Sequence, residues 1–292
     1  MTAAPLPKAA QPKTIHLQGG PEAVLLLHGL SSSPLELQFL ARHIHKAGYT
    51  VRVPVMAGYT SGLKQDCESD VDDWVNVALH EFDQLRSQFA SVSVGGLCLG
   101  SVLALRVAAL RWGEVKSLLC LSTSLHYDGW GNPALTPLLP LARYTPFARR
   151  IRVREKSPFG LKDTRMRAWV ERQMNEAGQS DAGAATLLVG DLLEARNLIA
   201  LSRSSLGAIT CPILLIHAKE DENATPRSSF EVASRVSSST IRVVLLSDSY
   251  HMISIDQEKD LVLSEMLQFL KNAVVADRRV DVSKPAKLIP LR

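Results

Sequence analysis

The sequence predicts an α/β fold, with a mostly parallel sheet covered by helices on both faces and interrupted by one helical insertion. Short, continuously apolar segments typical of buried parallel strands alternate along the chain with amphipathic or apolar helical segments. The alternation stops between residues 126 and 205, where no segment of sheet quality is found, and then resumes. The composition, 46% apolar and 21% charged over 292 residues, provides enough apolar side chains for a sizeable core.

These patterns divide the chain into a core with an inserted cap. We expect residues 15–125 and 206–275 to form the core. Residues 126–205 are expected to form a helical cap, because that interval is too short and too polar to bury a core of its own. Residues 1–14 are expected to form a flexible arm, and the polar residues 276–292 a partly disordered tail.

The core elements can be assigned in chain order. The segment AVLLL at 23–27 has the apolar character of a buried strand, and the next helix has Ser33 as N-cap, Pro34 in its first turn and Glu36 to close a capping box. The elements predicted before the cap are strands at 23–27, 50–55, 92–95 and 115–121 and helices at 33–48, 71–89 and 99–112. The later ones are cap helices at 165–177 and 184–201, strands at 212–217 and 241–246, and helices at 227–236 and 257–273.

The segment VSVGGLCLGS, residues 92–101, has the pattern of a nucleophile elbow. A side chain at the apex of such a turn has a strained backbone, so the residues two before and two after it must be small, and here they are Gly96 and Gly100. Cys98 occupies the apex. The following helix directs its N-terminal amides at this position, which favours a thiolate and later an oxyanion. The alternative is a buried cysteine that is merely flanked by glycines.

Polar residues follow the last two predicted strands at the edge where α/β folds bind ligands. Asp221 lies in the sequence AKEDEN after the strand at 212–217, and His251 lies in SDSYH after the strand at 241–246. The chain order nucleophile, acid, histidine is the order that a hydrolase elbow requires.

Five stretches of the chain resemble the α/β-hydrolase superfamily, and within it the small bacterial carboxylesterases and monoacylglycerol-lipase-like enzymes. They are LLLHGL, the Asp-Asp-Trp at 72–74, GLCLG, PILLIHAKEDENATP and SYHMISIDQEKD. The resemblance implies the α/β-hydrolase fold, with Cys98 as nucleophile, His251 as general base and Asp221 as orienting acid. It also implies an oxyanion hole formed by the amides of Leu30 and Leu99.

Two positions depart from the family pattern. Cys98 stands where the family has serine, as in dienelactone hydrolases and polyhydroxyalkanoate synthases, which the chain resembles at this position. Tyr250 stands where a glycine commonly precedes the catalytic histidine, which would narrow the mouth of the pocket. We expect Tyr250 and Trp130 to contact the substrate.

Other residues compete for these roles. Asp128 follows the strand after the elbow helix and could hold the acid in a variant arrangement, although the motif context favours Asp221. Glu220 and Glu222 are interpreted as solvated loop charges. His28 is interpreted as a structural histidine that braces the oxyanion loop.

Positive charge is concentrated in the predicted cap. Residues 126–172 contain ten Arg and Lys against four Asp and Glu, a net charge of +6, although the whole chain carries only +4. The chain is therefore not generally basic, and no nucleic-acid partner is expected. The basic cap would suit an anionic donor such as acyl-CoA or an acyl carrier protein, and the alternative is a solvated surface.

The sequence also limits the compartment and the cofactors. Its four cysteines have neither metal-ligand spacing nor the density of a disulfide framework, so we expect a reducing compartment, no metal and no cofactor. The first residues lack a continuous apolar signal segment, and no window has the length of a membrane span. We therefore expect a cytoplasmic protein without stable membrane insertion.

Three functional hypotheses follow. The first is a hydrolase of carboxylic esters or thioesters that acts through a Cys-His-Asp triad and a covalent acyl-enzyme. The second is an acyltransferase or cyclase that passes the acyl group from a CoA or carrier-protein thioester to an alcohol, amine or carbon acceptor. The third is a non-catalytic protein or an engineered serine-to-cysteine variant.

Overall fold

The structure is a computed structural model that describes residues 12–56, 58–61, 69–132, 144, 147–177, 179–180, 183–184 and 186–280. Most of the predicted arm, the end of the predicted tail and Cys67 lie outside the described residues.

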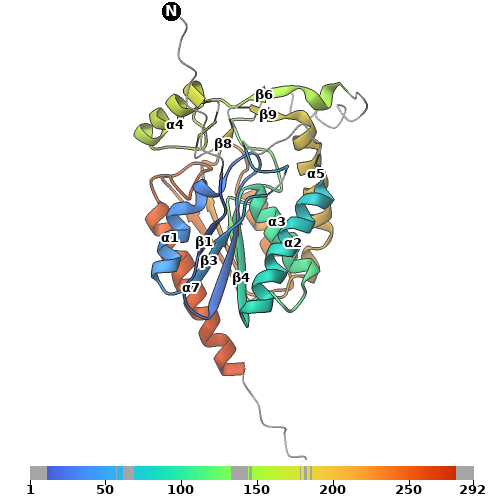
Figure 1. The fold of residues 1–292 in the computed structure, drawn as a ribbon, viewed down its shortest axis with the longest axis vertical. Helices are drawn as coiled ribbons and strands as arrows, with labels where there is room; N and C mark the ends of the chain where they lie inside the picture. Colours follow the sequence, from blue (N-terminus) through green and yellow to red (C-terminus); the bar gives the residue numbers. More distant parts are fainter. Residues whose placement is uncertain are drawn as a thin grey trace, which may run out of the picture.

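A seven-stranded sheet with the spatial order β1-β3-β2-β4-β5-β10-β11 forms the centre of the molecule (Figure 1). Strand β1 pairs with β3 in antiparallel orientation, and all other neighbouring strands are parallel. The predicted mostly parallel sheet is thereby confirmed, and β1 is an additional edge strand that the sequence analysis missed. The strands are β1 Ile15–Leu17, β2 Glu22–Leu27, β3 Thr50–Val53, β4 Ser91–Leu97, β5 Leu118–Leu121, β10 Ile213–Ala218 and β11 Ile241–Leu246.

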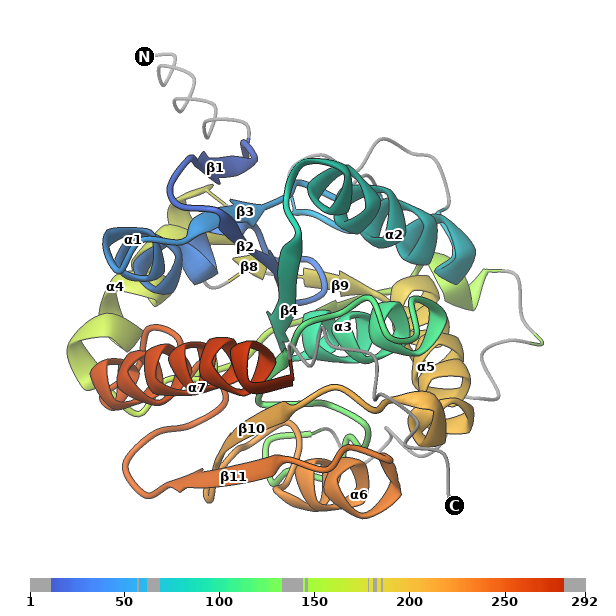
Figure 2. The same cartoon turned by 90° about the horizontal axis from the view of Figure 1, so that it is seen from below.

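Helices cover both faces of this sheet, as Figure 2 shows. One face carries α1 (Gln38–Lys46) and α7 (Lys259–Val280), and their apolar side chains belong to one buried cluster. The other face carries α2, α3, α5 and α6, whose apolar side chains join a second cluster. These helices are α2 Val71–Gln88, α3 Leu99–Leu110, α5 Val189–Ser204 and α6 Arg227–Arg235.

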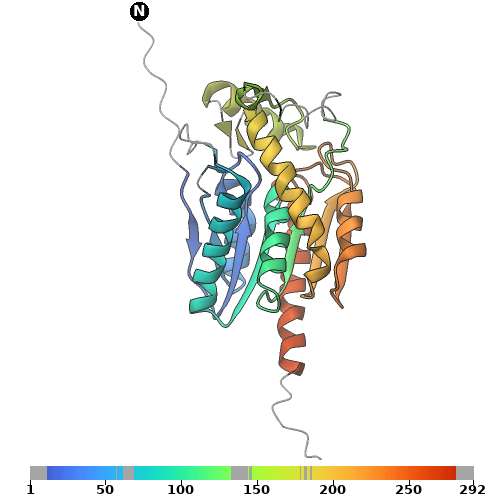
Figure 3. The same ribbon diagram turned by 90° about the vertical axis from the view of Figure 1, so that its right-hand side faces the viewer.

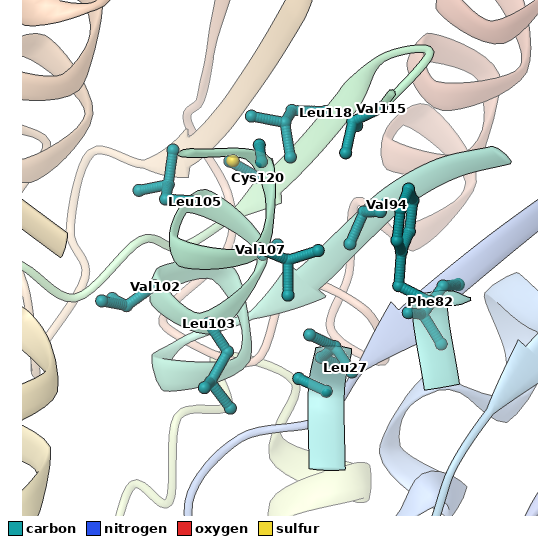
Figure 4. Close-up of a cluster of buried hydrophobic side chains, with 14 of the residues drawn as sticks. Leu27, Phe82, Val94, Val102, Leu103, Leu105, Val107, Val115, Leu118 and Cys120 are labelled. Atoms are coloured by element: carbon teal, nitrogen blue, oxygen red, sulfur yellow. The ribbon is translucent and has the colours of Figure 1, made fainter. Parts of the chain in front are cut away.

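Helix α3 lies at the centre of the second cluster because it is apolar on most of its faces. Its side chains pack between the sheet and the neighbouring helices, and Phe82 of α2 lies fully buried in the same cluster (Figure 4). Dense packing on both sides fixes α3, and with it the turn that precedes the helix.

The segment 126–205 differs in two ways from the predicted helical cap. It contains α4 (Thr164–Ala177) and also four strands of two or three residues each, none of which joins the central sheet. Helix α5 also begins at Val189, after the predicted start, and runs from the level of the cap along α3 (Figure 3). The four strands form two antiparallel pairs, β6 Arg152–Arg154 with β9 Thr186–Leu188 and β7 Gln179–Ser180 with β8 Gly183–Ala184.

A loop of this segment is fastened to the loop that follows β11. The amide of Met252 donates to the Gly160 carbonyl at 2.8 Å, and the amides of Lys162 and Asp163 both donate to the buried Asp256 carboxylate at 2.9 Å. These bonds hold residues 160–163 against the segment that contains His251.

The capping box predicted at Ser33 forms only in part. Ser33 is the N-cap of a 3₁₀ helix, Pro34–Leu37, and its hydroxyl accepts from the Leu35 amide at 3.3 Å. Glu36 does not complete the box, because its carboxylate is buried and binds the Gly29 amide and the Ser32 hydroxyl. Two further 3₁₀ helices are Ala148–Arg150 and Leu206–Ala208.

Within the described residues, every helix is too short or too polar to cross a membrane.

The packing around α3 predicts a large difference between two truncations. Phe82→Ala should reduce the free energy of unfolding by about 3–5 kcal/mol, because it leaves a cavity in a fully buried cluster. Leu110→Ala, which truncates a side chain that is 40% exposed at the end of α3, should cost well under half as much. Urea unfolding of the two variants measures both values, and equal losses would contradict the assigned core.

Candidate active site

Cys98 lies at the turn between β4 and α3. Its backbone has φ 58° and ψ −120°, a region that non-glycine residues rarely adopt, while its amide still donates to the Leu121 carbonyl at 3.0 Å. The pairing of Cys98 with β5 before the turn and the packing of α3 after it therefore maintain the strained backbone of Cys98. The half-buried Cys98 side chain lies at the end of the central strand.

The two glycines that flank Cys98 are required by close backbone contacts. A Cβ atom at Gly96 would lie 2.4 Å from the Gly100 carbonyl, and a Cβ atom at Gly100 would lie 2.0 Å from the Leu27 carbonyl oxygen. Any larger residue would have to displace backbone, so both positions need glycine for the turn to form.

Asp221 and His251 form a direct pair. They follow the parallel neighbours β10 and β11, and His251 Nδ1 lies 2.7 Å from Asp221 Oδ2 and 2.9 Å from Oδ1. Both side chains are buried. This contact assigns the proton to Nδ1 and leaves Nε2 as the ring nitrogen that can accept a proton.

Several donors keep Asp221 ionised. Burial alone would raise the pKa of this carboxyl, but His251 and His217, together with hydrogen bonds, hold the pKa well below its usual range. Its Oδ1 also accepts from the amides of Asn223 and Ala224, both at 2.9 Å. A carboxylate fixed in this way orients the imidazole of His251 and stabilises its positive charge.

His251 interacts electrostatically with Cys98 as well as with Asp221. Burial would lower the pKa of His251, but the negative charges of Asp221 and of a Cys98 thiolate outweigh that effect and raise the pKa well above its usual value. The Nε2 atom of His251 is buried and makes no hydrogen bond to the described residues. The structure thus brings Cys98, His251 and Asp221 together, with Nε2 available for proton transfer.

The sequence analysis missed one side chain of this site and misinterpreted another. Ser124 donates from its hydroxyl to the Cys98 sulfur at 3.4 Å, and the run Ser122-Thr123-Ser124 directly after β5 could have pointed to it. Glu222 is buried and its Oε2 accepts from the His251 amide at 3.1 Å, so its interpretation as a solvated loop charge was wrong. Burial raises the pKa of Glu222, and the positive charge of His251 opposes this rise.

Asp128, the competing acid, binds elsewhere. Its carboxylate accepts from the amide and the hydroxyl of Thr225, at 2.8 and 2.9 Å. The geometry therefore associates Asp128 with the segment before α6. Glu220, as expected, is an exposed residue, and it pairs with Lys162 at 2.9 Å.

The loop after β2 also lies close to Cys98. A Cβ atom at Gly29 would lie 3.5 Å from Cys98 Cβ, so this loop lies against the nucleophile. His28 is buried between the Gly29 carbonyl and the Thr60 hydroxyl, both at 2.8 Å, and burial lowers its pKa to about 4. His28 is therefore neutral near pH 7 and makes structural contacts.

The Leu30 amide has no acceptor among the described residues, and neither has the amide of Leu99, the first residue of α3. Two free amides on the two segments that flank Cys98 are suited to binding a developing oxyanion.

Trp130 and Tyr250 form an edge-to-face pair, with ring centroids 5.6 Å apart. Trp130 is 62% exposed and its indole N–H donates to the Glu220 carbonyl at 3.1 Å, while Lys162 Nζ lies 5.6 Å from the centre of the Tyr250 ring. Tyr250 directly precedes His251 in the chain, and the exposed Trp130 places the pair close to the surface.

Metal-binding groups of three or more His, Cys, Asp or Glu side chains do not occur in the part of the chain that the structure describes.

Known proteins resemble this chain over most of its length. The chain is 24% identical to a carboxylesterase of Bacillus subtilis (strain 168) over 266 residues, which cover 90% of this chain and 98% of the relative. It is also 24% identical to a thermostable monoacylglycerol lipase of Bacillus sp. (strain H-257) over 265 residues, which cover 91% and 96%. The fold superposes on a metagenome-derived lipolytic enzyme with a TM-score of 0.77 at 20% identity, covering 91% of this chain and 99% of that one.

The family described as serine aminopeptidase, S33, matches residues 21–258, a stretch that contains the elbow, Asp221 and His251. Because this match extends over most of the chain and includes both halves of the sheet, the protein is an enzyme of the α/β-hydrolase type that belongs to this family.

Proposed function

We propose that the protein hydrolyses carboxylic esters or thioesters through a Cys98–His251–Asp221 triad and a covalent acyl-enzyme. The observation that carries the proposal is the strained, half-buried Cys98 beside a buried histidine whose other nitrogen is held by an ionised carboxylate. The relatives named above, a carboxylesterase and a monoacylglycerol lipase, support an ester as substrate.

The steps follow from the positions of the groups. His251 Nε2 takes the proton of the Cys98 thiol, and the resulting thiolate attacks the carbonyl carbon. The carbonyl oxygen becomes an oxyanion that accepts from the Leu30 and Leu99 amides. When the tetrahedral intermediate collapses, the bond to the leaving group breaks, His251 protonates that group, and a thioester remains on Cys98. Water then gives a proton to His251 and attacks the thioester, which releases the acid and restores the thiol.

The geometry argues against a non-catalytic protein. The glycines and the strained turn are also needed by the fold, but the buried Asp221–His251 pair beside a thiol is arranged as proton transfer from that thiol requires. If Cys98 were an engineered replacement of a serine, the steps would be the same, but the sulfur would leave the acyl group with a different tendency from that of the serine oxygen. Trp130 and Tyr250 would contact the substrate at the mouth of the site.

An acyltransferase that uses the same triad is the second candidate, favoured by the exposed bases of the segment 126–172. Arg150, Arg152 and Arg154 are exposed, whereas Arg149 is paired with Glu194 at 2.9 Å. An exposed basic strip could attract the phosphates of an acyl-CoA or of an acyl carrier protein.

Alkylation tests the nucleophile. Burial raises the pKa of Cys120 to about 12 and that of Cys211 to about 12, so both stay protonated and slow near pH 7.5. Iodoacetamide should therefore label Cys98 before Cys120 and Cys211, and loss of p-nitrophenyl acetate hydrolysis should follow the labelling of Cys98 in proportion. Peptide mapping at short times measures it, with Cys98→Ala as the inactive control. Even labelling of the cysteines, or hydrolysis that survives full labelling of Cys98, would refute the nucleophile.

Two isosteric substitutions test the acid. Asp221→Asn should reduce kcat by roughly 10³–10⁴-fold, because an amide stabilises the wrong tautomer of His251 and cannot support its charge. Asp128→Asn is the matched control and should reduce kcat less than about threefold, since Asp128 contacts Thr225. Steady-state kinetics on one ester gives the ranking, and the reverse ranking would move the acid to Asp128.

Salt separates the two candidate functions. If an anionic thioester is the donor, its kcat/KM should fall steeply between low and moderate salt, because exposed charges are screened over about 8 Å at physiological ionic strength. Charge reversal of Arg152 and Arg154 to Glu should remove that slope, whereas a neutral short ester should show little dependence in either protein. Transfer further requires that an added alcohol or amine captures the acyl group in preference to water. If the anionic donor shows no salt dependence and no added acceptor captures the acyl group, the acyltransferase is excluded and the hydrolase stands.

A further inference from the structure

Glu36 is a buried carboxyl that no step above uses. Its side chain is 1% exposed and points back along the chain toward the loop after β2. One carboxylate oxygen binds the Gly29 amide and the other binds the Ser32 hydroxyl, so Glu36 joins both ends of residues 29–32.

The remaining amides of this loop show what the contacts achieve. The Ser31 amide donates to the Tyr59 carbonyl at 3.1 Å and the Ser32 amide donates to the Gly29 carbonyl at 3.2 Å. Ser31 also has a positive φ of 53°, so the loop is held in a strained conformation. Leu30 is left as the one residue of 29–32 whose amide donates to no other described residue.

The position of Gly29 connects this loop to the reaction. A Cβ atom there would lie 3.4 Å from Glu36 Oε1 and 3.5 Å from Cys98 Cβ, so the carboxyl, the loop and the nucleophile are in successive contact. A small displacement of Gly29 would therefore move the Leu30 amide relative to an acyl group on Cys98.

We propose that Glu36 is a positioning residue of the oxyanion hole, which holds residues 29–32 so that the Leu30 amide points at the carbonyl oxygen of the substrate. The inference rests on the proposed function, because an oxyanion forms only if Cys98 attacks a carbonyl group. Oxyanion donors act through their fixed orientation, so a residue that fixes a donor contributes to the rate without touching the substrate.

Protonation does not remove this bracing. Burial raises the pKa of Glu36 to about 7, against the effects of Ser32, Gly29 and the positive charge of His251, so both forms are present near neutral pH. Tyr59, which also faces Glu36, has its pKa raised well above the usual value, chiefly by burial, and stays neutral. Either form of the carboxyl can accept from the Gly29 amide, while Ser32 can donate to the ionised form or accept from the protonated form.

Two variants separate bracing from charge. Glu36→Ala removes both contacts and should reduce kcat for p-nitrophenyl acetate by about tenfold or more, approaching the roughly 10²–10³-fold loss that follows removal of an oxyanion donor. Glu36→Gln should retain kcat within about threefold of the parent, because its amide oxygen can accept from Gly29 and its amide nitrogen can donate to Ser32.

Alkylation by iodoacetamide is the second readout. This displacement at carbon forms no oxyanion, so the rate at Cys98 should stay within about twofold of the parent in both variants. Glu231→Ala is the matched control: it removes a partly buried carboxylate that accepts from Arg203, Arg235 and His126, and it should change neither rate.

The inference is overturned if Glu36→Ala retains parental ester turnover, or if it slows alkylation as much as turnover, which would show that Glu36 only supports the fold. If Glu36→Ala does not fold, Ser32→Ala removes one of the two contacts and should reduce ester turnover several-fold without slowing alkylation; unchanged turnover would equally overturn it. Failure of the proposed function is a different result, because the parent protein would then show no selective alkylation of Cys98 and no linked loss of hydrolysis.

Discussion

The strained turn at Cys98 is the constraint on which the rest of the site depends. The positive φ of Cys98 directs its side chain away from the end of β4. This strained conformation is maintained because the Cys98 amide donates to β5 and because the buried side chains of α3 hold the helix in place. The same turn brings Gly100 against the Leu27 carbonyl, which excludes every side chain at that position. One backbone conformation thus sets the packing of the helix and the position of the sulfur, and the loops after β2, β10 and β11 are arranged around that point.

The charged side chains beside His251 are acidic, although the chain as a whole has a positive net charge. The whole chain carries a net charge of +4 and residues 126–172 alone carry +6, but the charged side chains that bind His251 are carboxyls: Asp221 pairs with the ring, and Glu222 binds its amide. Basic side chains such as Arg149 and Lys162 instead form ion pairs with Glu194 and Glu220. A cation is therefore stabilised at the histidine, as proton transfer from the sulfur requires, and the basic surface can act on an approaching anion only over a distance.

Much of the fold could be predicted because each core strand is a short apolar run and each core helix has a periodic face. The same regularity placed Cys98, Asp221 and His251 after strand ends, where a parallel sheet gathers side chains. Features that depend on tertiary contacts could not be predicted. The sequence AKEDEN does not show which of its carboxylates faces inward, and Glu36 fits a local capping box as well as it fits the distant Gly29 amide. The short strands β6 and β9 pair across more than thirty residues, with too few positions to show alternation.

A thioester should form on Cys98 during turnover. Rapid acid quenching of the protein mixed with p-nitrophenyl butyrate, followed by intact-mass analysis and peptide mapping, measures this adduct directly. We expect a butyryl adduct that is confined to the peptide containing Cys98 and is absent from Cys98→Ala. Turnover of the ester by the Cys98→Ala protein at the parental rate, or an adduct on any other residue, would contradict it.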